Sequence, residues 1–124
     1  MKALSTTAAP AAIGPYSQAI MAGDTVYVSG QLPINPSTGE FAEGGIKEQA
    51  RQSLNNIKNI LSEAGMTMQQ VVKVTVLMTD MSDFAAVNEV YAEFFSAPYP
   101  ARSAFAVAAL PKGGAIEIEA VAVK

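Results

Sequence analysis

Residues 46–65 read IKEQARQSLNNIKNILSEAG and have a clear helical periodicity. Apolar side chains recur every three or four positions between Ile46 and Ala64, and most polar side chains fall on other sides of the turn. This spacing predicts a long amphipathic helix with one face on a core. Gly65 follows at the position where helices commonly end in a left-handed residue.

The segment after this helix changes to a two-residue period. Apolar and more polar side chains alternate over 72–79, which predicts a strand. Residues 80–83 then turn the chain, and Ser82 or Asp83 is expected to cap a second helix. Pro98 and Pro100 end that helix. The apolar face of the second helix is predicted to carry Phe84, Val87, Tyr91 and Phe94.

The flanking segments are extended in character. Residues 17–20 and 25–31 predict a β-hairpin around a turn at 22–24, and a loop rich in proline and glycine follows at 33–39. Residues 102–107 and 115–123 predict two closing strands.

The predicted element order is ββαβαββ within a single domain over residues 1–124. Few helices and one sheet predict an α+β fold, a two-layer sandwich in which two helices cover one face of a mixed sheet. The uncovered face of so small and apolar a domain predicts that subunits pack sheet to sheet in a closed ring.

The composition excludes several classes of function. The net charge is −3 without any run of Lys or Arg, which argues against nucleic acid as a partner. The chain has neither Cys nor His, so disulfides, thiolate nucleophiles and the usual metal sites are not expected. Polar residues interrupt the first twelve positions, and no apolar run reaches the length of a membrane span, so we expect a cytoplasmic protein without membrane contact.

Arg102 is a candidate anion ligand because it begins an apolar strand and has no acidic neighbour in the sequence. A guanidinium there suits a carboxylate. A surface arginine, or one paired with a distant acid, would show the same pattern.

Glu117 and Glu119 are two residues apart, so they share one face of a strand while Ile116 and Ile118 take the other. They are candidates for acid–base work, although a solvated strand face is the ordinary explanation for such a pair.

Three further residues are weaker candidates. Gly30 interrupts a strand, which indicates either a bulge or a ligand close to the backbone. Tyr16 follows Gly14-Pro15 and is either a ligand contact or a packed ring. Asn88 on the second helix is either a ligand contact or a solvated polar residue.

Taken together, these segments resemble the Rid family of reactive-intermediate deaminases, also called the YjgF family, and most closely its imine deaminase A branch. The resemblance covers essentially the whole chain, and it depends on the order and spacing of several motifs. These motifs are AAIGPYSQ at 11–18, VSGQ at 28–31 followed by Pro33, QARQ at 49–52, VNEVY at 87–91, PARS at 100–103 and IEIEA at 116–120.

The resemblance implies a chorismate-mutase-like homotrimer with clefts between subunits. It also implies hydrolysis of 2-iminobutanoate or 2-iminopropanoate to the 2-oxo acid and ammonia, without a cofactor. In this reading Arg102 grips the substrate carboxylate, Glu117 orients the attacking water and the backbone carbonyl of Ala104 helps to place that water. Tyr16, Ser29, Gly30 and Asn88 are implied to line the cleft.

The chain departs from the family pattern at Ala104, where the imine deaminases usually have cysteine, and at Ala106 and Ala109, where charged residues are common. The first change removes any thiol-dependent activity, and the other two leave the substrate preference open. Two alternative functions also remain. One is a trimeric sensor that binds 2-oxo acids without catalysis, and the other is an RNA-cleaving translation inhibitor, against which the acidic charge and missing histidine argue.

Overall fold

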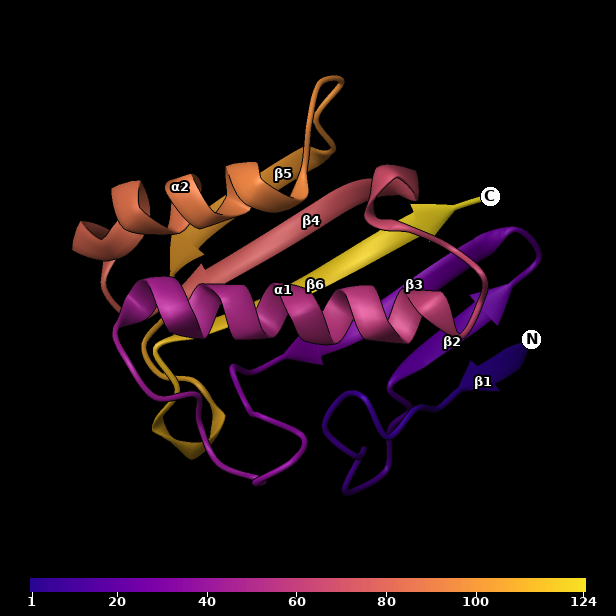
Figure 1. Ribbon diagram of the computed structural model, residues 1–124, viewed down its shortest axis with the longest axis horizontal. Helices are drawn as coiled ribbons and strands as arrows, with labels where there is room; N and C mark the ends of the chain where they lie inside the picture. The colour runs from indigo at the N-terminus through magenta and orange to yellow at the C-terminus, as the bar shows by residue number, and fades with distance from the viewer.

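The computed structural model describes residues 1–124 and contains one six-stranded sheet with two α-helices (Figure 1). Three short 3-10 turns complete it, at Met68–Gln70, Met81–Asp83 and Pro111–Gly113. None of the helices has the length and hydropathy that crossing a membrane requires. The elements are β1 (Lys2–Leu4), β2 (Ala19–Ala22), β3 (Thr25–Gln31), α1 (Ile46–Ser62), β4 (Val71–Met78), α2 (Phe84–Phe94), β5 (Ala101–Ala106) and β6 (Ile116–Val123).

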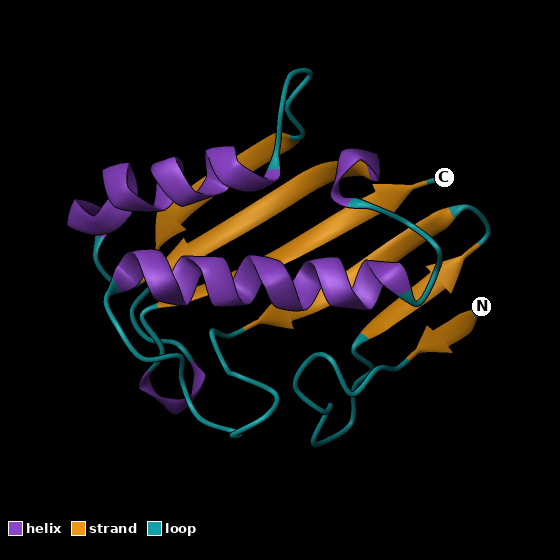
Figure 2. Ribbon diagram, in the orientation of Figure 1, coloured by secondary structure: helices purple, strands orange, loops and turns teal.

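The sheet is mixed, with the strand order β1-β2-β3-β6-β4-β5. β4 and β5 are parallel, since α2 carries the chain from one to the other, and every other neighbouring pair is antiparallel. Both α-helices lie on the same side of the sheet, with α1 across its middle and α2 above β4 and β5 (Figures 1 and 2). The predicted α+β class, the mixed sheet and the two helices are therefore confirmed.

The core lies between the helices and the sheet. α1 buries Leu54, Ile57 and Leu61 completely, as its helical spacing predicts. Beneath it, Ile116 and Ile118 of β6 are also completely buried. The opposite face of the sheet is uncovered. It exposes large apolar side chains, among them Tyr27 at 52%, Phe105 at 48% and Val123 at 37%.

Three details differ from the sequence predictions. β1 was not predicted, because three residues are too few to show a period, and it forms by pairing with β2. The two-residue period predicts that Val72 shares the face of Val74 and Val76, but Val72 is exposed, since the register of β4 with β6 shifts between Val71 and Lys73. Neither Ser82 nor Asp83 caps the second helix with its side chain; instead Asp80 accepts a hydrogen bond from the Ser82 N–H, 2.9 Å away, in the preceding turn.

Candidate functional site

A cavity of about 830 Å³ opens where the outer face of the sheet meets the loops at one end. It contains four of the predicted site residues, Tyr16, Ser29, Gly30 and Glu117. Glu119 also lines it, as the shared strand face predicts. The sequence segments 10–18, 29–39, 111–112 and 117–119 contribute its walls. Residues far apart in the sequence therefore meet at one site.

The carboxylate of Glu117 lies directly over Gly30. A Cβ atom on Gly30 would be 2.9 Å from Cδ of Glu117, which is closer than real Cβ contacts allow, and 3.1 Å from Cγ, which is tighter than most. The pairing of β3 with β6 is irregular between Val28 and Gln31, so Gly30 sits in a bulge. The bulge interpretation of Gly30 is therefore confirmed, and the missing side chain makes room for a carboxylate of the same chain. Gly30 also lines the cavity, so a ligand close to its backbone stays a prediction.

Burial raises the pKa of Glu117, and the nearby charge of Glu119 raises that pKa further. Glu117 is half-buried in the wall of the cavity, whereas Glu119 is exposed. A carboxyl group in such a place holds a proton more readily than one in water, so it suits general acid–base chemistry.

The other predicted residues form a second group on the helix side of the sheet. Arg102 of β5 donates a hydrogen bond from Nη1 to Oδ1 of Asn88 on α2, at 2.8 Å. Its guanidinium carbon is 4.6 Å from the centre of the Tyr91 ring. Arg102 makes no salt bridge, so it is not paired with a distant acid within one subunit. Its side chain is exposed in the single subunit, as the surface alternative predicts. Ala104 is two residues farther along β5, opposite Val76.

Arg102 and Glu117 do not meet within one subunit. Arg102 pairs with Val74, which is buried beneath the helices, and Glu117 pairs with Leu77 on the outer face. Side chains of directly opposed residues point to the same face of a sheet, so these two functional groups point to opposite faces. Two strand spacings and a three-residue offset also separate their Cα atoms by roughly 14 Å.

The profile of the family described as Endoribonuclease L-PSP matches residues 6–124. The chain belongs to this family, which is also known as YjgF or Rid. The predicted family membership is therefore confirmed.

Named relatives of this Rid chain are similar over nearly their full length. The 2-iminobutanoate/2-iminopropanoate deaminase of Capra hircus is 54% identical, and the alignment covers 98% of this chain and 88% of the relative. The crystal structure of RidA from a Psychrobacter species has a TM-score of 0.96 and 52% identity, with 100% of both chains covered. Escherichia coli TdcF with bound serine has a TM-score of 0.95 and 47% identity, with 100% of this chain and 99% of the other covered.

Two further residues that line the cavity of this Rid chain, Gln18 and Lys112, were not among the predicted site residues. The side-chain nitrogen of Gln18, a buried residue, donates to the carbonyls of Thr6, Ala9 and Pro10 at 3.0, 3.3 and 2.7 Å. Lys112 lines the cavity and is the one non-glycine residue with a positive φ, at 58°. Neither the burial of Gln18 nor the backbone conformation of Lys112 shows up as a periodic pattern in the sequence. The position of Lys112 between Pro111 and Gly113 indicates a turn, and this is the one sequence signal for either residue.

Ser29 ties the bulged strand to the loop that carries Tyr16. Its hydroxyl donates to the carbonyl of Ser17 at 2.6 Å, and its backbone N–H donates to the carbonyl of Gln18 at 3.0 Å. Tyr16 itself is 54% exposed, so it is not a packed ring within the subunit. The Ser29 hydroxyl keeps its lone pairs for a ligand in the cavity.

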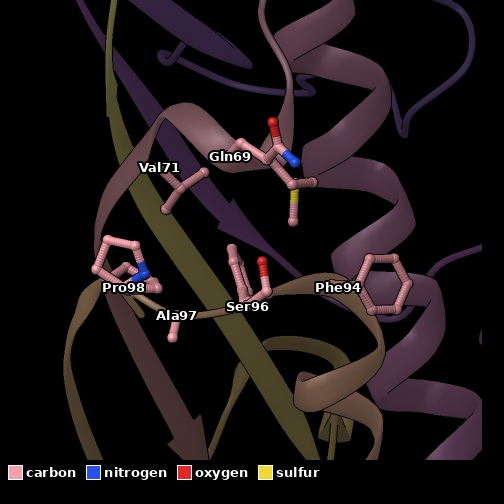
Figure 3. A pocket seen from close by; sticks show the side chains of 9 residues that line it. Gln69, Val71, Phe94, Ser96, Ala97 and Pro98 are labelled. Atoms are coloured by element: carbon pink, nitrogen blue, oxygen red, sulfur yellow. The ribbon is translucent and has the colours of Figure 1, made fainter.

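A second, smaller cavity of about 260 Å³ lies between the start of β4 and the segment after α2. Figure 3 shows Gln69, Val71, Phe94, Ser96 and Pro98 around it. None of its lining side chains is charged. It therefore offers no group for acid–base chemistry or for gripping a carboxylate.

Proposed function

We propose that this Rid chain hydrolyses the 2-imino acids 2-iminobutanoate and 2-iminopropanoate to the 2-oxo acid and ammonia. The observation that carries the proposal is the pair of functional groups the fold prepares. One is a guanidinium held by Asn88 with its other donors free, and the other is a half-buried carboxylate, Glu117, in the wall of a cavity. The deaminase name of relatives more than 50% identical supports the same reaction.

The reaction needs few groups, because an imine carbon next to a carboxylate is already electrophilic. Arg102 holds the substrate carboxylate in a two-pronged contact. Glu117 accepts a proton from water as the water oxygen bonds to the imine carbon, and it returns this proton to the imine nitrogen, which gives an amino alcohol. Glu117 then carries the proton of the new hydroxyl to the amino nitrogen, the C–N bond breaks, and ammonia leaves as the carbonyl of the 2-oxo acid forms.

Ala104 contributes to this mechanism through its backbone. β5 is an edge strand of the sheet, so part of its backbone has no partner in the subunit. A carbonyl that helps to place water does not depend on the side chain, so alanine in place of the usual cysteine is compatible with hydrolysis.

We infer that each active site is shared between two copies of the chain. Arg102 and Glu117 point to opposite faces of one sheet, so a second copy must bring its Arg102 to the first copy's Glu117. Two different surfaces then meet, and such a heterologous contact repeats until a ring closes. Three copies make the smallest ring of this kind, and the apolar side chains on the outer face become covered.

The first prediction is a homotrimer in solution. Light scattering at micromolar concentration is expected to give a single species about three times the 12.9 kDa chain mass. A monodisperse monomer would rule out a site that needs two copies.

The second prediction concerns pH. Glu117 acts as a base only when ionised, so turnover is expected to fall as the pH drops through its raised pKa. Glu119→Gln removes the like charge that contributes to this rise, so the acidic limb of the kcat/KM profile moves to lower pH. The rate on the plateau stays within about threefold of the parent, because the variant leaves Glu117 and Arg102 in place. If the acidic limb does not move, Glu119 does not contribute to the raised pKa of Glu117.

A coupled assay with threonine dehydratase tests the reaction. The chain is expected to speed the appearance of 2-oxobutanoate and ammonia from the imine that the dehydratase releases. Binding of 2-oxobutanoate without any acceleration would favour the non-catalytic sensor. Salt-sensitive cleavage of RNA, with no effect on the imine, would favour the activity that the family description names.

A further inference from the structure

Three side chains of helix α2 lie next to the guanidinium of Arg102. Phe84, Asn88 and Tyr91 are four and three residues apart, so they lie along one face of the helix. The guanidinium carbon is 4.6 Å from the Tyr91 ring centre and 5.3 Å from the Phe84 ring centre, while Nη1 is bonded to Asn88 at 2.8 Å. Cations bind to aromatic faces at such distances.

The Tyr91 ring is buried and packs against a second buried ring. Tyr91 and Phe95 are both 6% exposed, and their ring centres are 4.5 Å apart. The Tyr91 hydroxyl is buried and has no hydrogen-bond partner. A buried unpaired hydroxyl costs folding free energy, so within the subunit the ring of Tyr91, and not its hydroxyl, stabilises the structure.

We propose that Tyr91 is a positioning residue that fixes the orientation of the Arg102 guanidinium. This inference rests on the proposed function, because it gives Arg102 a carboxylate to bind. With the guanidinium carbon over the Tyr91 ring and Nη1 bonded to Asn88, the Nε and Nη2 donors remain for a planar carboxylate approaching from outside. Without these contacts to α2, the side chain of Arg102 would sample many rotamers and would lose part of its pre-organised geometry.

The test compares Tyr91→Leu with the matched control Tyr91→Phe. Tyr91→Leu is expected to raise both KM and the Kd for 2-oxobutanoate, so that kcat/KM falls about threefold to thirtyfold. Tyr91→Phe keeps the ring and is expected to stay within about twofold of the parent. A large loss in Tyr91→Phe would mean that the hydroxyl acts directly, and it would overturn the positioning role of the ring.

A double-mutant cycle separates positioning from folding. In an Arg102→Ala background, Tyr91→Leu is expected to cause no further loss of kcat/KM or of 2-oxobutanoate binding. An equal loss in both backgrounds would show that Tyr91 acts on the fold and would overturn the proposal. If the parent chain binds 2-oxobutanoate but does not hydrolyse the imine, the proposed function fails, and the binding cycle still decides the role of Tyr91. If the parent neither hydrolyses the imine nor binds 2-oxobutanoate, both fail.

Discussion

Glu117→Gln is expected to lower kcat for imine hydrolysis by about a hundredfold to ten-thousandfold, the range that general bases contribute. The amide has the size of the carboxyl group and still fits over Gly30. It cannot accept a proton from water, so the attacking water is no longer activated. Binding of 2-oxobutanoate is expected to remain close to that of the parent, because Arg102 makes the carboxylate contact. Steady-state kinetics and calorimetry measure the two quantities separately.

Glu119→Gln is the matched control for this variant. It removes the neighbouring carboxylate on the same strand face, in the same cavity, without touching the proposed base. Its turnover should be close to that of the parent above the acidic limb. If Glu119→Gln were inactive and Glu117→Gln active, the roles of the two glutamates would have to be exchanged.

Arg102→Ala is expected to lower kcat/KM by about tenfold to a few hundredfold. A charge-assisted hydrogen-bonded pair contributes about 1.5 to 3 kcal/mol, and each 1.36 kcal/mol is about tenfold in rate or affinity. The loss should appear in KM, in the Kd for 2-oxobutanoate and in kcat, because an unheld imine does not keep its carbon beside the water. The trimer is expected to persist, since Arg102 makes no salt bridge in the fold.

Arg102→Lys provides the control for charge. Lysine keeps the positive charge but cannot make the two-pronged contact, so it is expected to recover only a fraction of the loss. A trimeric Arg102→Ala variant with the parent rate on 2-iminobutanoate would mean that the substrate carboxylate is bound elsewhere. Lys112, which lines the cavity and makes no salt bridge, would then be the first residue to test.

The sequence was most informative where apolar residues recur with the period of a helix or strand and are buried in the structure. The spacing of α1 predicted most of the side chains that the helix buries, although Ser53, Asn56 and Ile60 are buried as well. The alternation of β6 predicted that Ile116 and Ile118 enter the core. The same alternation turned Glu117 and Glu119 to the outer face together, since Ile116 and Ile118 must be buried. Hence the shared direction of the two glutamates could be predicted from the pattern of a single strand.

The direction of Arg102 could not be predicted in this way. The residues of β5 show no contrast between an apolar and a polar face, and almost all of them are exposed in the subunit. Its position on the helix side depends on the parallel register with β4 and on the rings of α2. Periodicity assigned Phe84 and Tyr91 to the core. Tyr91 is indeed buried, but its ring also faces the guanidinium.

Features without a period also escaped prediction. The bulge at Gly30 becomes meaningful only when Glu117, far away in the sequence, is found above it. Gln18 is buried because its amide bonds to three carbonyls of one loop, which alternation alone does not reveal. A contact between separate segments depends on the tertiary structure, and local patterns do not contain it.

Subunit complementation tests most directly whether imine hydrolysis takes place at a site shared by two copies. Arg102→Ala and Glu117→Gln chains are co-expressed, purified together without separating mixed trimers from homotrimers, and assayed for 2-oxobutanoate and ammonia from 2-iminobutanoate. With random assembly from equal amounts, about one quarter of the clefts combine an intact Glu117 with an intact Arg102. We predict that the mixture recovers about a quarter of the parent activity, which is more than either variant has alone. Activity no greater than the average of the two separate variants would contradict a shared site.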